Sequence, residues 1–151
     1  MRLSTKGRYA VMAMTDLARN GEGRAVTLAE IAERQEISLA YLEQLFARLR
    51  RGGLVKSVRG PGGGYKLART AAETAIAAIV QAVDEPLQAT RCAIEAKGAG
   101  CMSGGERCLT HGLWDALGRQ IESYLASVSL EDVLERRVER PFTHAAAQVA
   151  A

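Results

Sequence analysis

Three cysteines and a histidine cluster in the second half of the chain, in the pattern Cys92-x8-Cys101-x6-Cys108-x2-His111. Three thiolates and one imidazole form a complete four-ligand set for a metal centre. Structural zinc usually includes a tight C-x2-C pair, whereas wide gaps can wrap a larger iron–sulfur cluster. The pattern therefore indicates a metal site, with a cluster favoured over zinc and over three unligated cysteines. The second histidine, His144, we treat as incidental.

A cytosolic chain rarely keeps disulfides, so three clustered thiols indicate metal or redox chemistry. No run of about 18 apolar residues exists, which predicts no membrane span. Asp16 interrupts the apolar stretch near the N-terminus, which argues against a signal peptide. We therefore expect a cytoplasmic protein.

A Gly-rich segment at 60–64, "GPGGG", follows Arg59 and raises the question of phosphate binding. A nucleotide-binding P-loop requires Ser or Thr directly after its lysine, and Lys66 lacks one. The flanking segments have strand character, which predicts a β-hairpin. In winged helix-turn-helix proteins such a hairpin follows the recognition helix and is called a wing. We therefore expect Arg59, and the backbone of Gly60, which carries no side chain, to contact DNA. A plain hairpin turn is the alternative.

Helical periodicity and capping residues predict the other elements. The expected helices cover 4–20, 27–34, 38–51, 72–85, 111–128 and 129–137, and the expected strands cover 54–59 and 64–68. The second and third helices indicate a helix-turn-helix, with N-caps at Thr27 and Ser38. Glu36 stands at the turn position where Gly is common, which costs about 1 kcal/mol. We expect a mainly α fold with a small β-hairpin wing, a winged helix-turn-helix, plus a long helix.

That long helix carries a stripe of apolar residues at approximately heptad spacing. Its members are Leu113, Trp114, Leu117, Ile121, Tyr124, Leu125 and Val128.

The net charge of +3 is unevenly distributed along the chain. Residues 1–70 hold 13 Lys/Arg against 6 Asp/Glu, and residues 71–151 hold 7 against 11. A basic first half predicts that a polyanion binds there. The candidate DNA contacts are Ser38, Ala40, Tyr41, Glu43, Gln44, Arg48, Arg50, Arg51, Arg59 and Gly60.

Three of these side chains suggest specific roles. Gln44 has the fork that bonds adenine, while the arginines suit phosphate or guanine. Phosphates repel the Glu43 carboxylate unless it accepts a hydrogen bond from a cytosine amino group. We therefore expect Glu43 to lower affinity for DNA sequences that lack this cytosine. Tyr41 could reach a phosphate or simply pack. An ordinary solvated helix face is the alternative for Glu43 and Gln44.

Four segments carry a specific resemblance. They are "MRLSTKGRYAVMAM", "ISLAYLEQLFARLRRGGLVKSVRGPGGGY", "AVDE" and "RC…C…CLTHGLW". Together they resemble the IscR family of bacterial iron–sulfur cluster assembly regulators, within a superfamily of winged-helix repressors. The resemblance covers about residues 1–135.

The resemblance implies a homodimer joined by the long helix, with one [2Fe–2S] cluster per protomer. Carried over by position, the ligands are Cys92, Cys101, Cys108 and His111. Two departures stand out: the gaps between cysteines are somewhat long, and Glu36 replaces the usual turn glycine.

These observations divide the chain into a DNA-binding domain, a cluster-binding loop, a dimerisation region and a tail. We place them at 1–85, 86–110, 111–137 and 138–151, and expect the tail to be disordered.

We expect a transcription regulator that senses iron–sulfur sufficiency and controls cluster-assembly genes. Its expected partners are double-stranded DNA, a second copy of the chain and, transiently, the cluster-assembly machinery. The alternatives are a zinc-stabilised repressor, a nitric oxide or redox sensor using the same cluster, and an electron-transfer or redox enzyme. No nucleophile–base pair or paired carboxylates are evident, which predicts a non-enzyme.

Overall fold

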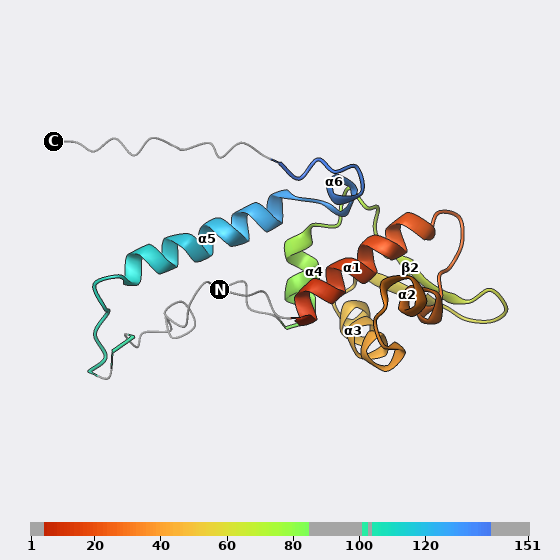
Figure 1. Ribbon diagram of the computed structural model, residues 1–151, viewed down its shortest axis with the longest axis horizontal. Coiled ribbons are helices and arrows are strands. Elements are labelled where there is room, and N and C mark those ends of the chain that lie inside the picture. Colours follow the sequence, from red (N-terminus) through yellow and green to blue (C-terminus); the bar gives the residue numbers. More distant parts are fainter. Residues whose placement is uncertain (1–4, 85–100, 103, 140–151) are drawn as a thin grey trace.

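The computed structural model describes residues 5–84, 101–102 and 104–139, and these are mostly helical with one antiparallel hairpin (Figure 1). The elements are α1 (Thr5–Asn20), α2 (Leu28–Gln35), α3 (Leu39–Arg51), β1 (Val55–Val58), β2 (Gly64–Leu67), α4 (Ile76–Ala82), α5 (His111–Ser127) and α6 (Leu130–Leu134). The expected winged helix-turn-helix plus a long helix is confirmed. We call α1–α4, the hairpin and α6 together the winged-helix body.

The turn between α2 and α3 places Glu36 in the left-handed conformation, at φ 54° and ψ 39°. Both flanking caps are present, because Thr27 accepts from the Glu30 N–H and Ser38 accepts from the Tyr41 N–H. The Glu36 N–H donates to the Ala32 carbonyl oxygen, and Ile37 directly after it is buried. Burial of this side chain offsets the conformational cost of a non-glycine residue in the turn.

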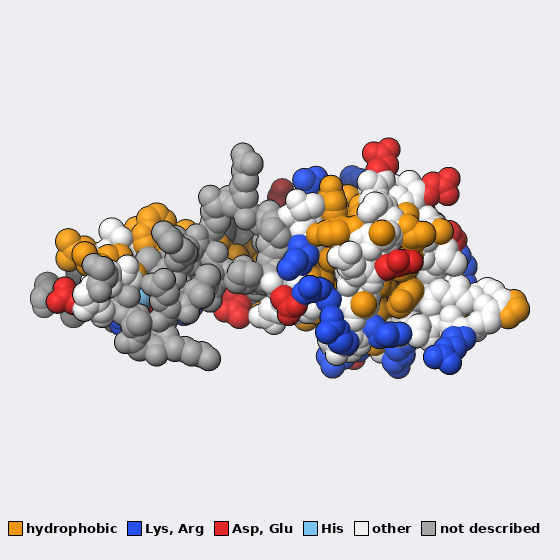
Figure 2. Space-filling view, turned by 90° about the horizontal axis from the view of Figure 1, so that it is seen from below, with side chains coloured by type: hydrophobic (Ala, Val, Ile, Leu, Met, Phe, Trp, Pro, Cys, Tyr) orange, Lys and Arg blue, Asp and Glu red, His pale blue; other side chains and the backbone are white. Residues whose placement is uncertain are grey.

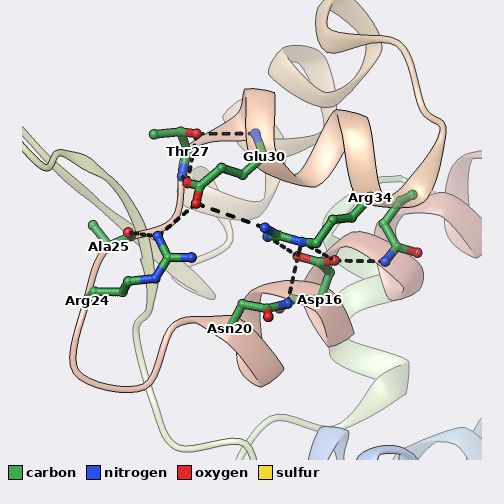
Figure 3. A network of polar contacts seen from close by, with 8 residues as sticks. Asp16, Asn20, Arg24, Ala25, Thr27, Glu30 and Arg34 are labelled. Atoms are coloured by element: carbon green, nitrogen blue, oxygen red, sulfur yellow. Dashed lines mark hydrogen bonds and ion pairs between the residues drawn. The ribbon is translucent and has the colours of Figure 1, made fainter.

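A buried carboxylate joins α1 to α2 (Figure 3). Asp16 is only 5% exposed, and Arg34 donates to it from Nη2 at 2.6 Å and from Nε at 3.0 Å. Gln35 and Asn20 also donate to this carboxylate. Burial alone would raise the pKa of Asp16, but these hydrogen bonds and the Arg34 charge outweigh it, so its pKa lies below the ordinary value. The network fixes the orientation of the helix-turn-helix on α1.

Helix α4 begins at Ile76, so the prediction of a helix over 72–85 is wrong at its start. Residues before Ile76 are held in another conformation by Thr70, whose N–H and hydroxyl both donate to the Glu73 carboxylate. Ala75 is extended and forms an antiparallel bridge with Ser129. Helix α6 is also shorter than its predicted range, because it ends at Leu134.

One hydrophobic core holds the winged-helix body together. Its largest fully buried side chains include Met14, Leu17, Phe46 and Ile79. Leu130 joins this core from far along the sequence, because its N–H donates to the Thr74 carbonyl oxygen at 2.9 Å. The C-terminal end of α5 is therefore tied to the body through the residues that follow it.

The hairpin and α5 project from opposite ends of the body (Figure 1). The hairpin is secured by Tyr65, whose N–H donates to the Val26 carbonyl oxygen at 2.7 Å and whose ring lies against Phe46. Helix α5 contacts α4, where the Gln81 side chain donates to Glu122 at 3.3 Å. No helix in the described ranges is long and apolar enough to cross a membrane.

Candidate nucleic-acid interface and metal centre

Helix α3 is amphipathic, and its outer face carries half of the predicted DNA contacts. Leu42, Leu45, Phe46 and Leu49 anchor the inner face in the core. The exposed residues on the outer face are Ala40, Glu43, Gln44, Arg50 and Arg51. The core therefore holds these side chains on one rigid element, in the manner of a recognition helix.

Other predicted contacts on α3 have partners within the protein. The Ser38 hydroxyl caps the helix by accepting from the Tyr41 N–H at 3.3 Å. The Tyr41 ring is half-buried and lies edge-on to Tyr9, with centroids 6.0 Å apart. Arg48 forms an ion pair with Asp84, which follows α4. Binding DNA through Arg48 would therefore compete with this ion pair.

The hairpin tip is built for close approach to another surface. The Gly63 N–H donates to the Gly60 carbonyl oxygen at 2.9 Å, with Pro61 between them and Gly62 at φ 72°. Pro followed by a residue of positive φ matches a type II turn. Arg59 and Gly60 are exposed at its start. The turn thus presents an arginine beside backbone that carries no side chain.

Lys and Arg side chains gather along one edge of the body. Figure 2 shows them along its lower margin, leading toward the projecting hairpin. Sequence reasoning missed two cations of this region, Lys56 and Lys66, and it also missed Asp84. Both lysines lie within the strands expected over 54–59 and 64–68, whereas no local signal indicates that Asp84 lies against Arg48.

Three of the four predicted metal ligands lie in the described part of the chain. Cys101 Sγ is 3.6 Å from His111 Nδ1, and the Cys108 N–H donates to Cys101 Sγ at 3.0 Å. Cys108 Sγ is 3.6 Å from the Thr110 hydroxyl. Cys92 lies outside the described residues, and within those described no set of three His, Cys, Asp or Glu residues is placed to hold a metal ion.

The chemistry of these residues nevertheless fits a metal–sulfur group. One thiol and one imidazole already converge, although ten residues separate Cys101 from His111. A backbone N–H directed at the same sulfur is the kind of bond that stabilises a thiolate ligand. His111 opens α5, so a ligand at this position would connect the metal directly to a rigid helix.

Comparison with known proteins identifies the family. A family model named Rrf2, described as an iron-dependent transcriptional regulator, matches residues 3–136. The chain belongs to the Rrf2 family. Rrf2 proteins are transcription regulators, so this chain is a DNA-binding transcription regulator and not an enzyme.

Several Rrf2 relatives carry the name HTH-type transcriptional regulator IscR. The relative from Xenorhabdus nematophila is 54% identical over 137 residues, which cover 91% of this chain and 81% of the relative. A relative from Escherichia coli is 51% identical over the same length, covering 91% of this chain and 82% of its own. Together with the family match, these relatives indicate an iron–sulfur cofactor in general.

Solved structures of Rrf2 regulators share the fold. T. potens IscR has a TM-score of 0.72 and 38% identity, covering 91% of this chain and 88% of its own. CymR, the global cysteine regulator of B. subtilis, has a TM-score of 0.75 and 30% identity, covering 90% and 98%. The winged-helix assignment therefore agrees with experimentally solved relatives.

Proposed function

We propose that each protomer binds one [2Fe–2S] cluster through Cys92, Cys101, Cys108 and His111. The observation that carries this proposal is the approach of Cys101 Sγ to His111 Nδ1, with the Cys108 N–H donating to the same sulfur. The cluster would supply a redox-active and labile group whose presence depends on iron and sulfide supply. Binding through imidazole also requires a deprotonated ring, which makes occupancy sensitive to pH.

The functional unit we propose is a homodimer joined along α5. Leu113 is 61% exposed, and Leu117 and Tyr124 are each 36% exposed. These residues lie within 40° of one another around an ideal helix, so they form one apolar face. A second copy of α5 would cover this face and would set the distance between two recognition helices.

Cluster occupancy would then control which operators the dimer binds. Ligation by His111 would fix the first turn of α5, and α5 determines the spacing of the two copies of α3. Specific DNA would in return stabilise the bound cluster, because coupling between two binding sites is reciprocal. We propose that the operators lie at cluster-assembly genes, that the assembly machinery contacts the protein transiently to load it, and that both happen in the cytoplasm.

The decisive experiment is a visible absorption spectrum of protein purified without oxygen, with iron, sulfide and zinc assayed on one sample. The proposal expects visible bands and two irons and two sulfides per chain, as the [2Fe–2S] formula requires. A colourless protein with about one zinc per chain would overturn it and indicate a structural zinc site.

A pair of histidine variants tests ligand identity. We expect His111→Ala to lose the visible bands, while His144→Ala, a matched control at the other histidine, keeps them. Circular dichroism checks that both variants retain their helices. Unchanged bands in His111→Ala would remove this residue from the ligand set.

A further inference from the structure

The recognition helix and hairpin lie in a stretch with no acidic residues. From residue 44 to residue 72 the sequence contains no Asp or Glu. The cations in this stretch are Arg48, Arg50, Arg51, Lys56, Arg59, Lys66 and Arg69. Two of these cations, Lys56 and Lys66, lie neither on α3 nor at the hairpin tip but within the strands β1 and β2.

These two lysines stand directly opposite each other. Lys56 in β1 pairs with Lys66 in β2, in the register set by Val55 opposite Leu67 and Ser57 opposite Tyr65. Side chains directly opposite on one face have Cβ atoms only about 5 Å apart, and like charges at that position are destabilising. The hairpin therefore carries a repulsive pair at its centre.

The lysines occupy the outer face of the hairpin. Val55 is buried and Tyr65 packs on Phe46, so this alternating set faces the body. Lys56 and Lys66 lie between these positions and are exposed. Neither forms an ion pair with any residue in the described ranges. No carboxylate in the part of the chain that the structure describes therefore offsets their mutual repulsion.

We propose that Lys56 and Lys66 form a phosphate clamp that binds the DNA backbone beside the hairpin tip. A phosphate between the two ammonium groups would replace their repulsion by two attractions. Lys56 is three residues from Arg59, about 10 Å along an extended strand. The clamp therefore contacts a phosphate other than those at the groove edge that Arg59 approaches. Such a contact positions the protein and reads no base.

The clamp predicts that one mutation lowers DNA affinity without lowering the stability of the DNA-free protein. Replacing Lys56 by Gln removes a phosphate contact, so DNA affinity falls. The same change removes the repulsion with Lys66, so the urea midpoint of the DNA-free protein rises or stays unchanged. Ordinary solvated lysines would affect neither quantity.

The test measures DNA affinity against salt for K56Q/K66Q, using both an operator duplex and a random duplex. We expect the slope of log K against log [salt] to weaken on both duplexes by about 0.9 for each bound protomer, because each clamp neutralises one phosphate. K56R/K66R should retain the slope, because it keeps both charges. The matched control is Arg19→Gln. Arg19 is exposed and lines a groove together with Val133 of α6, away from the proposed DNA-binding side.

Two outcomes would overturn the clamp. One is a slope for K56Q/K66Q no weaker than that of Arg19→Gln. The other is a loss confined to one operator sequence, because that would indicate base readout. Urea unfolding of the DNA-free variants confirms that they remain folded, and each single variant should lose about half of the slope change.

Discussion

The winged-helix body and α5 differ in how completely they bury their apolar side chains. In the body, Met14, Leu17 and Phe46 are fully buried within one chain. In α5 only Gly118 is buried, while Leu113 is 61% exposed. The body therefore completes its own core, whereas the helix that begins at His111 is incomplete without another surface. The proposed DNA contacts and the proposed cluster ligands thus lie in regions that differ in how much apolar surface they leave exposed.

The largest effect we expect comes from a charge placed on the exposed apolar face of α5. We expect Leu113→Glu to prevent association, because an interface would have to bury two carboxylates. A monomer engages only one half-site, so operator affinity should fall roughly a hundredfold. Sedimentation and operator binding measure the two effects, while thermal unfolding of the body should change little.

Ala126→Glu is the matched control for this variant. Ala126 is exposed and lies on the opposite side of α5 from Leu117 and Tyr124. A dimer that survives Leu113→Glu but not Ala126→Glu would show that another face of α5 makes the interface.

Two hairpin glycines test how closely the hairpin packs on the rest of the winged-helix body. A Cβ at Gly64 would lie 2.4 Å from the Val26 carbonyl oxygen, whereas a Cβ at Gly62 would meet nothing within 4 Å. Both have positive φ. We expect Gly64→Ala to cost about 3 kcal/mol of unfolding free energy and Gly62→Ala about 1 kcal/mol. Urea unfolding measures both, and equal losses would contradict the close approach to Val26.

The Asp16 network provides a test by pH. We expect Asp16→Asn to lower the free energy of unfolding by about 2 kcal/mol near pH 7, because Asn removes the carboxylate charge that pairs with Arg34. The folded pKa of Asp16 lies below its ordinary value. Its contribution is therefore complete above the unfolded pKa of about 3.9 and is lost as pH falls through the folded pKa. Stability of Asp16→Asn should fall less steeply below about pH 4 than that of the parent. Glu22→Gln, at an exposed loop residue, should keep the parent's slope.

The smallest expected effect concerns the ion pair between Arg48 of the recognition helix and Asp84, which follows α4. Asp84→Asn should release Arg48 for phosphate binding and raise affinity for random DNA about threefold at low salt. The gain should vanish in an Arg48→Ala background. Asp115→Asn is the matched control, because it makes the same charge change beside Arg119 on α5. An equal gain in that control would assign the effect to net charge.

Local signals in the sequence predicted much of the body. The predicted caps at Thr27 and Ser38 are both present, and the hairpin forms where Gly-rich sequence separates two β-prone segments. The start of α4 could not be predicted, because it depends on a bridge between Ala75 and Ser129, 54 residues apart. The approach of Cys101 to His111 was expected from ligand chemistry, whereas the Arg48–Asp84 ion pair has no sequence signal.

The anchoring of α5 at one end has a mechanical consequence. Its C-terminal end is tied to the body near Val128 and Leu130, and its first residue is His111. A helix of 17 residues is a stiff rod about 25 Å long. Each degree of tilt at the tied end moves the histidine end by about 0.4 Å on that length. Helix α5 thus acts as a lever, and a displacement of 1 Å at His111 corresponds to a rotation of the helix by only two to three degrees, by the same geometry.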